Sequence, residues 1–180
     1  MFITKGASSY TESGGAARIR GFDVDLQAVP AEGLTLTAGF AYTDGKYTDF
    51  GNATSYAPTG GAAVVVDATG NRTVNTPRFT ANSSVNYEVP LASGKLTFSG
   101  SASYTGKYYF TADNRATQYE VFLLNGRVRW ETDNERLSVS LWGKNLTDER
   151  YFAGFNISNY GDLIQFTAPR TYGVTVGTKF

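Results

Sequence analysis

The sequence has 180 residues, enough for one domain with a buried core, and its 16 basic and 16 acidic residues leave no net charge. A zero balance argues against a nucleic-acid partner, which would need a basic face. The chain contains no cysteine and no histidine, which excludes thiol nucleophiles, disulfides, Cys or His metal sites and histidine acid–base chemistry. We therefore expect neither an enzyme nor a cofactor.

The composition is rich in strand-forming and turn-forming residues, with 20 glycines, 12 tyrosines and 12 phenylalanines. No stretch approaches the about 18 uninterrupted apolar residues of a transmembrane helix. A mean hydropathy of -0.27 still allows a membrane barrel, because a barrel strand is apolar on only one of its two faces. Residues 1–20 lack the apolar core of a signal peptide, so we expect a removed leader or a start inside a longer protein.

Seven stretches alternate apolar and polar residues with a period of two, as strands with one apolar face do. In the first of them, Phe22 and Val24 flank Asp23. In chain order, the predicted strands cover residues 22–28, 34–42, 79–89, 96–104, 124–130, 137–141 and 172–180. Their lengths are near the about 9–11 residues with which a tilted strand crosses a bilayer.

The links between these strands alternate in length. Three are tight turns rich in Pro, Gly, Asp and Asn, at residues 30–33, 90–94 and 131–135. The three longer links cover residues 44–77, 112–118 and 146–168. Outer-membrane barrels have short periplasmic turns and long extracellular loops. The pattern therefore predicts an all-β fold, an antiparallel transmembrane β-barrel segment of about seven to eight strands.

Aromatic residues gather near both ends of the predicted strands, with Ala, Val and Leu between them. Such belts are typical of the two membrane–water interfaces. The belt at the long-loop end comprises Tyr42, Phe79, Tyr104, Tyr108, Tyr109, Phe110, Tyr119 and Tyr172. The belt at the short-turn end comprises Tyr87, Phe98, Trp130 and Phe180. The alternative is that these rings fill the core of a soluble β-protein.

The charged face of the strands cannot meet hydrocarbon, where a mid-bilayer Arg or Lys costs about 2–4 kcal/mol. The side chains expected to face a wet or protein-filled interior are Asp23, Asp25, Asn82, Glu88, Arg127 and Arg129. Outer-membrane lipid is then the partner of the apolar face. Trp142 falls in the polar phase of its strand, which leaves the register near the following loop open.

Five stretches resemble the barrel of TonB-dependent outer-membrane receptors, in the order that this family has them. Residues 141–151 (LWGKNLTDERY) are similar to the family's W-x-KNLTDxRY stretch, and residues 169–180 (PRTYGVTVGTKF) to its final strand. The other similar stretches are residues 17–25, 34–44 and 75–79. The resemblance implies that residues 1–180 are the C-terminal portion of such a barrel, with the plug domain and signal peptide absent.

The resemblance also implies a function, the energised uptake of a scarce nutrient such as a ferric siderophore across the bacterial outer membrane. The full receptor would take a small molecule or metal chelate and would contact TonB only through the missing N-terminal plug. The last strand resembles the C-terminal signal that the barrel-assembly machinery recognises, although Thr178 is less apolar than that pattern prefers. The residues of this predicted assembly signal are Tyr172, Val174, Val176 and Phe180.

Two other hypotheses remain open. The chain could form a self-contained eight-stranded outer-membrane barrel with a structural or adhesive role, or a soluble β-barrel that binds a ligand. Some loop aromatics could stack on an aromatic ligand, although packing on one another is favoured. These rings belong to Tyr47, Phe50, Tyr56, Tyr151, Phe152, Phe155 and Tyr160. The sequence assigns no substrate-binding residue.

Overall fold

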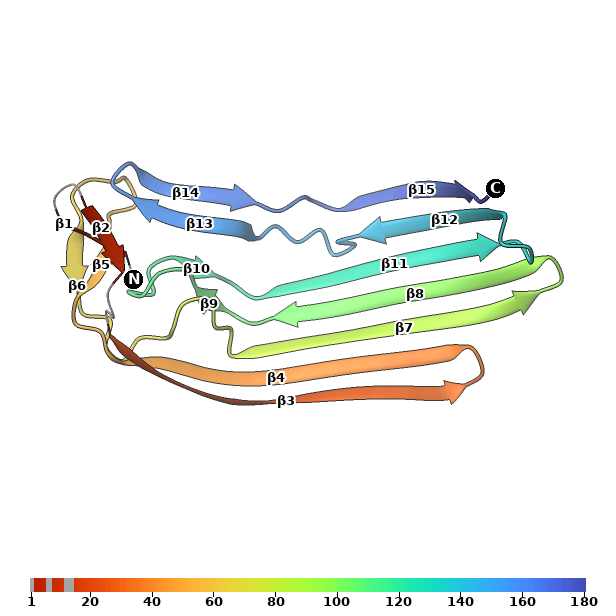
Figure 1. Cartoon of the computed structure of the whole chain (residues 1–180), viewed down its shortest axis with the longest axis horizontal. Coiled ribbons are helices and arrows are strands. Elements are labelled where there is room, and N and C mark those ends of the chain that lie inside the picture. Colours follow the sequence, from red (N-terminus) through yellow and green to blue (C-terminus); the bar gives the residue numbers. More distant parts are fainter. Residues whose placement is uncertain (1, 6–7, 12–14) are drawn as a thin grey trace.

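The computed structural model describes residues 2–5, 8–11 and 15–180 and consists of strands and loops. Within these ranges no helix is long and apolar enough to cross a membrane. The long strands are β3 (Ala16–Ala31), β4 (Leu34–Asp49), β7 (Phe79–Leu91), β8 (Gly94–Thr105), β11 (Val121–Glu131), β12 (Leu137–Lys144) and β15 (Thr171–Thr178). They form one antiparallel sheet in the order β15-β12-β11-β8-β7-β4-β3 (Figure 1).

All seven predicted strands are confirmed, and the largest departures from the predicted bounds are in β3 and β4. β3 and β4 continue past the predicted strand ends and pair as far as Ala16 and Asp49. The prediction of a loop from Asp44 is therefore wrong by several residues. The cause is local composition. In this extension Arg20 and Asp44 lie on the face that carries Phe22, and Ile19 lies on the opposite face. The alternation therefore changes phase and no longer continues the pattern of the predicted strand.

Four short hairpins complete the fold. They are β1 (Phe2–Lys5) with β2 (Ser8–Thr11), β5 (Ala53–Ser55) with β6 (Val64–Val66), β9 (Tyr108–Tyr109) with β10 (Thr117–Gln118), and β13 (Phe152–Ser158) with β14 (Gly161–Phe166). β1 and β2 pair with each other and not with the large sheet. They supply no eighth strand, which speaks against a self-contained eight-stranded barrel.

The outward face of the sheet is apolar and open. Phe22, Phe40, Tyr42 and Phe79 form a continuous aromatic group on it, with ring centroids 5.3–6.2 Å apart. The buried hydrophobic residues of the described structure are limited to Ala53, Ala68, Ala116 and Val121. The apolar sides of the strands are thus not packed into a core of their own. This contradicts the soluble β-protein alternative and leaves the face available to lipid.

The opposite face carries the predicted interior residues. The side chains of Asp25 and Asn82 both lie beside Gly39, and Arg129 forms an ion pair with Glu131. A row of side-chain hydrogen bonds crosses this face from β4 to β15, joining Thr37 to Ser84, Asn86 to Ser99, Ser101 to Asn125, Arg127 to Ser140, and Trp142 to Thr175, at 2.7–3.2 Å. The charged and hydroxyl-bearing side chains therefore share one surface.

The register at Trp142, which the sequence left open, is regular. Trp142 lies opposite Gly173, and its indole N–H donates to Thr175 Oγ1 at 3.1 Å. A Cβ atom at position 173 would stand 2.6 Å from Trp142 Cζ2, so only glycine leaves room for the ring. The tryptophan belongs to the polar face, and no slip of β12 is needed to explain it.

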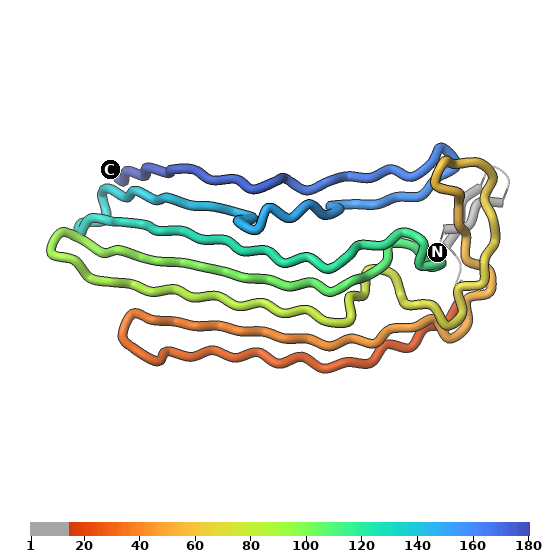
Figure 2. Tube along the Cα trace, turned by 180° about the vertical axis from the view of Figure 1, so that it is seen from behind, coloured from red at the N-terminus to blue at the C-terminus, as the bar shows by residue number. Residues whose placement is uncertain are grey.

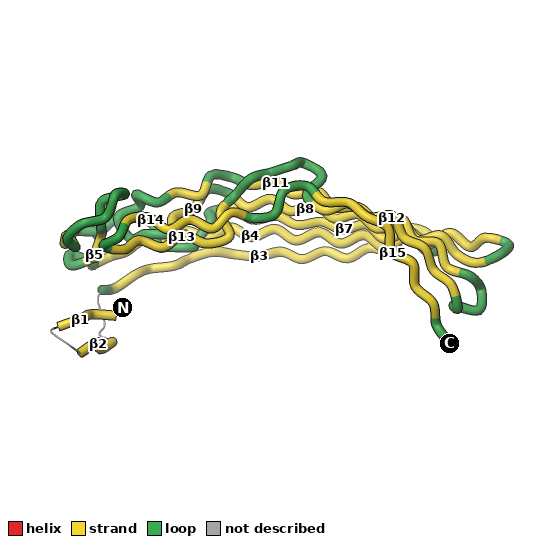
Figure 3. Tube along the Cα trace, turned by 90° about the horizontal axis from the view of Figure 1, so that it is seen from above, coloured by secondary structure: helices red, strands yellow, loops and turns green. Residues whose placement is uncertain are grey.

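Seen from above, the long strands form one bowed layer (Figure 3). Seen from behind, the short turns lie at one end and the long connections gather at the other (Figure 2). The free edges of this sheet are β3 and β15, and both run from the long-loop end to the short-turn end (Figure 1). The sheet is open and has the shape of a barrel wall.

Candidate functional site

Three long connections meet at one end of the sheet. We call them outer loop 1 (residues 50–78, with β5 and β6), outer loop 2 (residues 106–120, with β9 and β10) and outer loop 3 (residues 145–170, with β13 and β14). They contain the loop aromatics, except Tyr47 of β4, and most of the long-range polar contacts of the described structure. This layer is the candidate functional site.

Outer loop 2 is joined to outer loop 1 by a reciprocal pair of hydrogen bonds. Asn114 Oδ1 accepts the backbone N–H of Arg72 at 2.9 Å, and Asn114 Nδ2 donates to the Arg72 carbonyl at 2.9 Å. Asn114 has a φ of 56°, a left-handed conformation that asparagine tolerates better than most residues. Arg72 also forms a 2.9 Å ion pair with Asp44 in the outer part of β4. Both loops are therefore anchored to the sheet.

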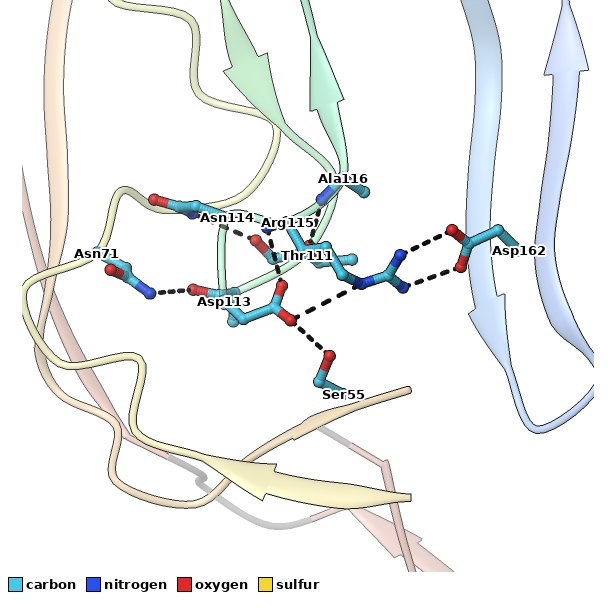
Figure 4. Close-up of polar contacts among 9 residues, drawn as sticks. Ser55, Asn71, Thr111, Asp113, Asn114, Arg115, Ala116 and Asp162 are labelled. Carbon is cyan, nitrogen blue, oxygen red and sulfur yellow. Dashed lines mark hydrogen bonds and ion pairs between the residues drawn. The ribbon is translucent and has the colours of Figure 1, made fainter. Parts of the chain in front are cut away.

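An ion pair joins outer loop 2 to outer loop 3 (Figure 4). The guanidinium of Arg115 donates to both carboxylate oxygens of Asp162, at 2.7 and 2.9 Å. This hydrogen bonding raises the pKa of Arg115. Nearby, Ser55 of β5 donates to Asp113. Burial alone would raise the pKa of the Asp113 carboxyl. Hydrogen bonds from Ser55, Thr111 and the Arg115 backbone, together with the positive charge of Arg115, outweigh burial and hold this pKa below its usual value.

Aromatic rings pack beside this ion pair, in what we call the outer aromatic cluster. Phe110 of outer loop 2 stacks on Phe155 of β13, with centroids 5.5 Å apart and planes at 18°. Tyr108 contacts Phe110 edge-on at 5.2 Å. Phe152 completes the cluster by contacting Phe155 at 5.9 Å and Phe166 at 5.3 Å. The cluster therefore spans outer loops 2 and 3.

A pocket of about 490 Å³ opens next to this cluster. Its lining consists of Asn75, Pro77, Thr105, Tyr108, Phe110, Ala153, Gly154 and Phe155, none of them charged. Thr105 lies opposite Thr80, a residue of the polar face, so the pocket lies at the loop end of that face. Three aromatic rings together with uncharged polar groups suit a flat aromatic ligand that also carries hydrogen-bonding groups.

A larger hollow, of about 630 Å³, lies further along the polar face. Its lining includes Arg127, Trp142 and Lys144 together with hydroxyl and amide side chains. The Lys144 ammonium lies 5.9 Å from the Trp142 ring. This hollow is the concave inner surface of the bowed sheet, so its contents depend on what fills the barrel interior.

The loop aromatics named from the sequence mostly contact other rings. Tyr47 packs on Phe50 at 4.9 Å, and Phe152 packs on Phe155. Tyr160, at the tip between β13 and β14, is 91% exposed. Four residues predicted for the membrane belt lie in outer loop 2 instead, namely Tyr108, Tyr109, Phe110 and Tyr119. The chain turns away from the sheet after Thr105, which the aromatic composition could not reveal.

Three of the four residues of the predicted assembly signal share an outward orientation along the last strand. Tyr172, Val174 and Val176 lie on the apolar face of β15, opposite residues 143, 141 and 139, and are largely exposed. Phe180 lies two residues beyond the end of β15 and is fully exposed. The geometry groups the first three on one face, and their role stays a prediction.

The sequence did not indicate the ion pair between Arg115 and Asp162, which is the polar centre of the site. Arg115 and Asp162 are 47 residues apart and lie in two different loops. The short charged stretch from Asp113 to Arg115 was the only local feature, and charged loop residues are usually solvated. No periodicity connects it to β14.

Residues 2–146 match the family described as TonB dependent receptor-like, beta-barrel. The pesticin receptor of Yersinia pestis is 30% identical over 111 residues, which are 62% of this chain and 16% of that receptor. The chain therefore corresponds to a small part of the length of the curated relatives it matches.

Solved structures show the same likeness. The ferric yersiniabactin uptake receptor from Yersinia pestis has a TM-score of 0.73 at 22% identity, over 89% of this chain and 23% of that one. The ferric preacinetobactin receptor from Acinetobacter baumannii has a TM-score of 0.67 at 25% identity, over 89% of this chain and 22% of that one. In each case the shared part is an all-β portion of a larger receptor.

Proposed function

This chain belongs to the family of TonB-dependent receptor-like β-barrels, and on that premise we propose that it forms the C-terminal strands and outer loops of a nutrient importer. The proteins it matches are outer-membrane receptors rather than enzymes. Its residence is the bacterial outer membrane, where its apolar face meets lipid. We assign residues 1–180 to the C-terminal portion of the receptor barrel, with its outer loops, and coupling to TonB to a plug segment of the whole receptor.

The ligand class that fits the site best is a ferric siderophore with aromatic groups. The observation that carries this proposal is the uncharged pocket beside Tyr108, Phe110 and Phe155, at the outer end of the polar face. Aromatic rings of a chelate would pack against these side chains with centroids about 4.5–7 Å apart. The 25% identical relative named a ferric preacinetobactin receptor supports the same ligand class.

Truncation of one ring should weaken ligand binding. We expect Phe155→Ala to lower the affinity for the iron(III) complex of 2,3-dihydroxybenzoate about tenfold, because an aromatic anchor contributes on the order of 1.4 kcal/mol. Binding of the chelate labelled with radioactive iron to membranes that contain the receptor measures this. Tyr160→Ala, on the same hairpin and almost fully exposed, is the matched control and should bind like the wild type.

The cellular role is tested by deleting the gene that encodes this chain. Growth in iron-depleted medium and uptake of labelled iron should fall for at least one ferric chelate, and the wild-type gene should restore both. If uptake of a broad panel of ferric chelates is unchanged in the deletion strain, the siderophore proposal is wrong.

We also propose that Tyr172, Val174, Val176 and Phe180 form the C-terminal signal for barrel assembly. Phe180→Ala should reduce the amount of folded receptor in the outer membrane several-fold, because an exposed terminal ring is available for recognition. Heat-modifiable mobility of membrane extracts measures the folded fraction.

The matched control for this variant is Lys179→Ala, which changes the neighbouring residue and removes an exposed ion pair with Glu135. It should assemble normally. Purified Phe180→Ala should refold into lipid vesicles as well as wild type does. A refolding defect there would mean that the ring stabilises the barrel rather than marking it for assembly.

A further inference from the structure

We infer that Arg115 is a positioning residue, which holds outer loop 3 against outer loop 2 and keeps the aromatic pocket assembled before a ligand arrives. The role concerns the same pocket as the proposed function and rests on it only for the identity of the ligand. The inference rests on two rigid units of the outer loops and on two contacts that join them.

The first unit is the turn of outer loop 2 that contains both Phe110 and Arg115. The backbone N–H of Phe110 donates to the Ala116 carbonyl at 2.9 Å, and the Ala116 N–H donates to Thr111 Oγ1 at 3.1 Å. The N–H of Asn114 donates to the Thr111 carbonyl at 3.0 Å. These hydrogen bonds hold residues 110–116 together as one compact turn. The Phe110 ring and the Arg115 guanidinium are therefore attached to the same backbone unit.

The second unit is the β13–β14 hairpin, which contains both partners of that turn. Asp162 lies opposite Ile157, and Phe155 lies opposite Ile164. The two partners are therefore fixed near each other by the strand register. The bidentate ion pair and the ring stack join the two units at separate points, which restrains rotation as well as separation.

The surroundings of Arg115 fit a structural contact better than a ligand contact. Its side chain is only 25% exposed and that of Asp162 only 14%. Both terminal nitrogens donate to Asp162, and Nε lies 4.0 Å from Asp113 Oδ2. Arg115 is not among the residues that line the pocket. Outer loop 1 supports the partner, since the Asp162 N–H donates to the Pro58 carbonyl at 3.1 Å.

The direct test is hydrogen exchange of the ligand-free receptor. Arg115→Gln should raise the exchange rate of amides in residues 108–116 and 152–164 about tenfold, because the variant keeps the stack but loses the ion pair. Arg150→Gln is the matched control: it removes an exposed arginine of outer loop 3 and should leave both segments unchanged. Equal exchange in Arg115→Gln and wild type overturns the inference, whatever the uptake assay gives.

The second test restores the tether without the charges. These 180 residues contain no cysteine, so Arg115→Cys combined with Asp162→Cys gives this chain its only two thiols, which a short bis-methanethiosulfonate cross-linker can join. The double variant should bind the iron(III) complex of 2,3-dihydroxybenzoate about tenfold more weakly, as expected when only a tenth of the molecules hold the pocket assembled. Cross-linking should restore wild-type affinity, and a reductant should remove the gain.

Two outcomes separate this inference from the proposed function. If the cross-linked pair stays as weak as the open pair, Arg115 contacts the ligand itself and the positioning role is wrong. If the wild-type receptor binds no ferric chelate while Arg115→Gln still exchanges faster, the siderophore proposal fails and the positioning role stands.

Discussion

Replacing Ala102 with arginine should destabilise the folded barrel by about 2–4 kcal/mol, the cost of a guanidinium at the midplane of the lipid face. Ala102 lies in β8 opposite Ser83 and Leu124, between Phe98 and Tyr104 on the outward face. Unfolding by urea in phospholipid vesicles, followed by tryptophan fluorescence, measures the loss of stability.

The adjacent residue gives the matched control. Ser103 has a similar volume but lies opposite Asn82 and Leu123 on the polar face, so an arginine there can reach water or polar groups. Ser103→Arg should change the free energy of unfolding by less than about 1 kcal/mol. If it proves the more damaging substitution, the assignment of lipid and interior faces is reversed.

Replacing Asn145 with alanine should destabilise the barrel by about 2–5 kcal/mol. Asn145 is 8% exposed and has a φ of 51°, which costs alanine about 1–2 kcal/mol. Its side-chain oxygen accepts the Glu149 N–H at 3.0 Å, and its side-chain nitrogen donates to the Glu149 carbonyl at 2.9 Å. Loss of these partners leaves a partly buried N–H unpaired, at about 1–3 kcal/mol. The same urea titration measures the change.

Glycine at position 145 separates the two contributions. Asn145→Gly relieves the backbone conformation but removes the same hydrogen bonds, so it should be about 1 kcal/mol less destabilising than Asn145→Ala. Equal losses in both variants would assign the whole effect to the side-chain contacts. A wild-type value for Asn145→Ala would show that the turn after β12 does not depend on this residue.

The large sheet was predictable because every long strand has one face against lipid and one against a polar interior. That demand imposes a period of two on the sequence, which is visible at Phe22, Val24 and Leu26. This pattern of apolar and polar residues changes where the strands leave the bilayer. Above the bilayer, the outward face of β3 and β4 becomes charged, with Arg20 opposite Asp44, and the extension was read as loop.

The site was predictable only in part. The sequence placed aromatic rings in the outer loops and favoured their packing on one another, which Phe152 and Phe155 confirm. It did not foresee that Phe110 leaves the membrane belt, or that Arg115 reaches Asp162. These contacts depend on how separate loops meet in space, and neither spacing nor local composition encodes a partner 47 residues away.

The two edge strands, β3 and β15, run in the same direction, and this limits how the sheet can be closed into a barrel. A closed cylinder in which every neighbour is antiparallel needs an even number of strands, so seven strands require an odd complement. In a tandem fusion or gene duplication of this unit, β15 of the first copy would lie beside β3 of the second, and these two strands would be parallel. A minimal designed pore built from this wall would therefore need at least one added strand for each copy.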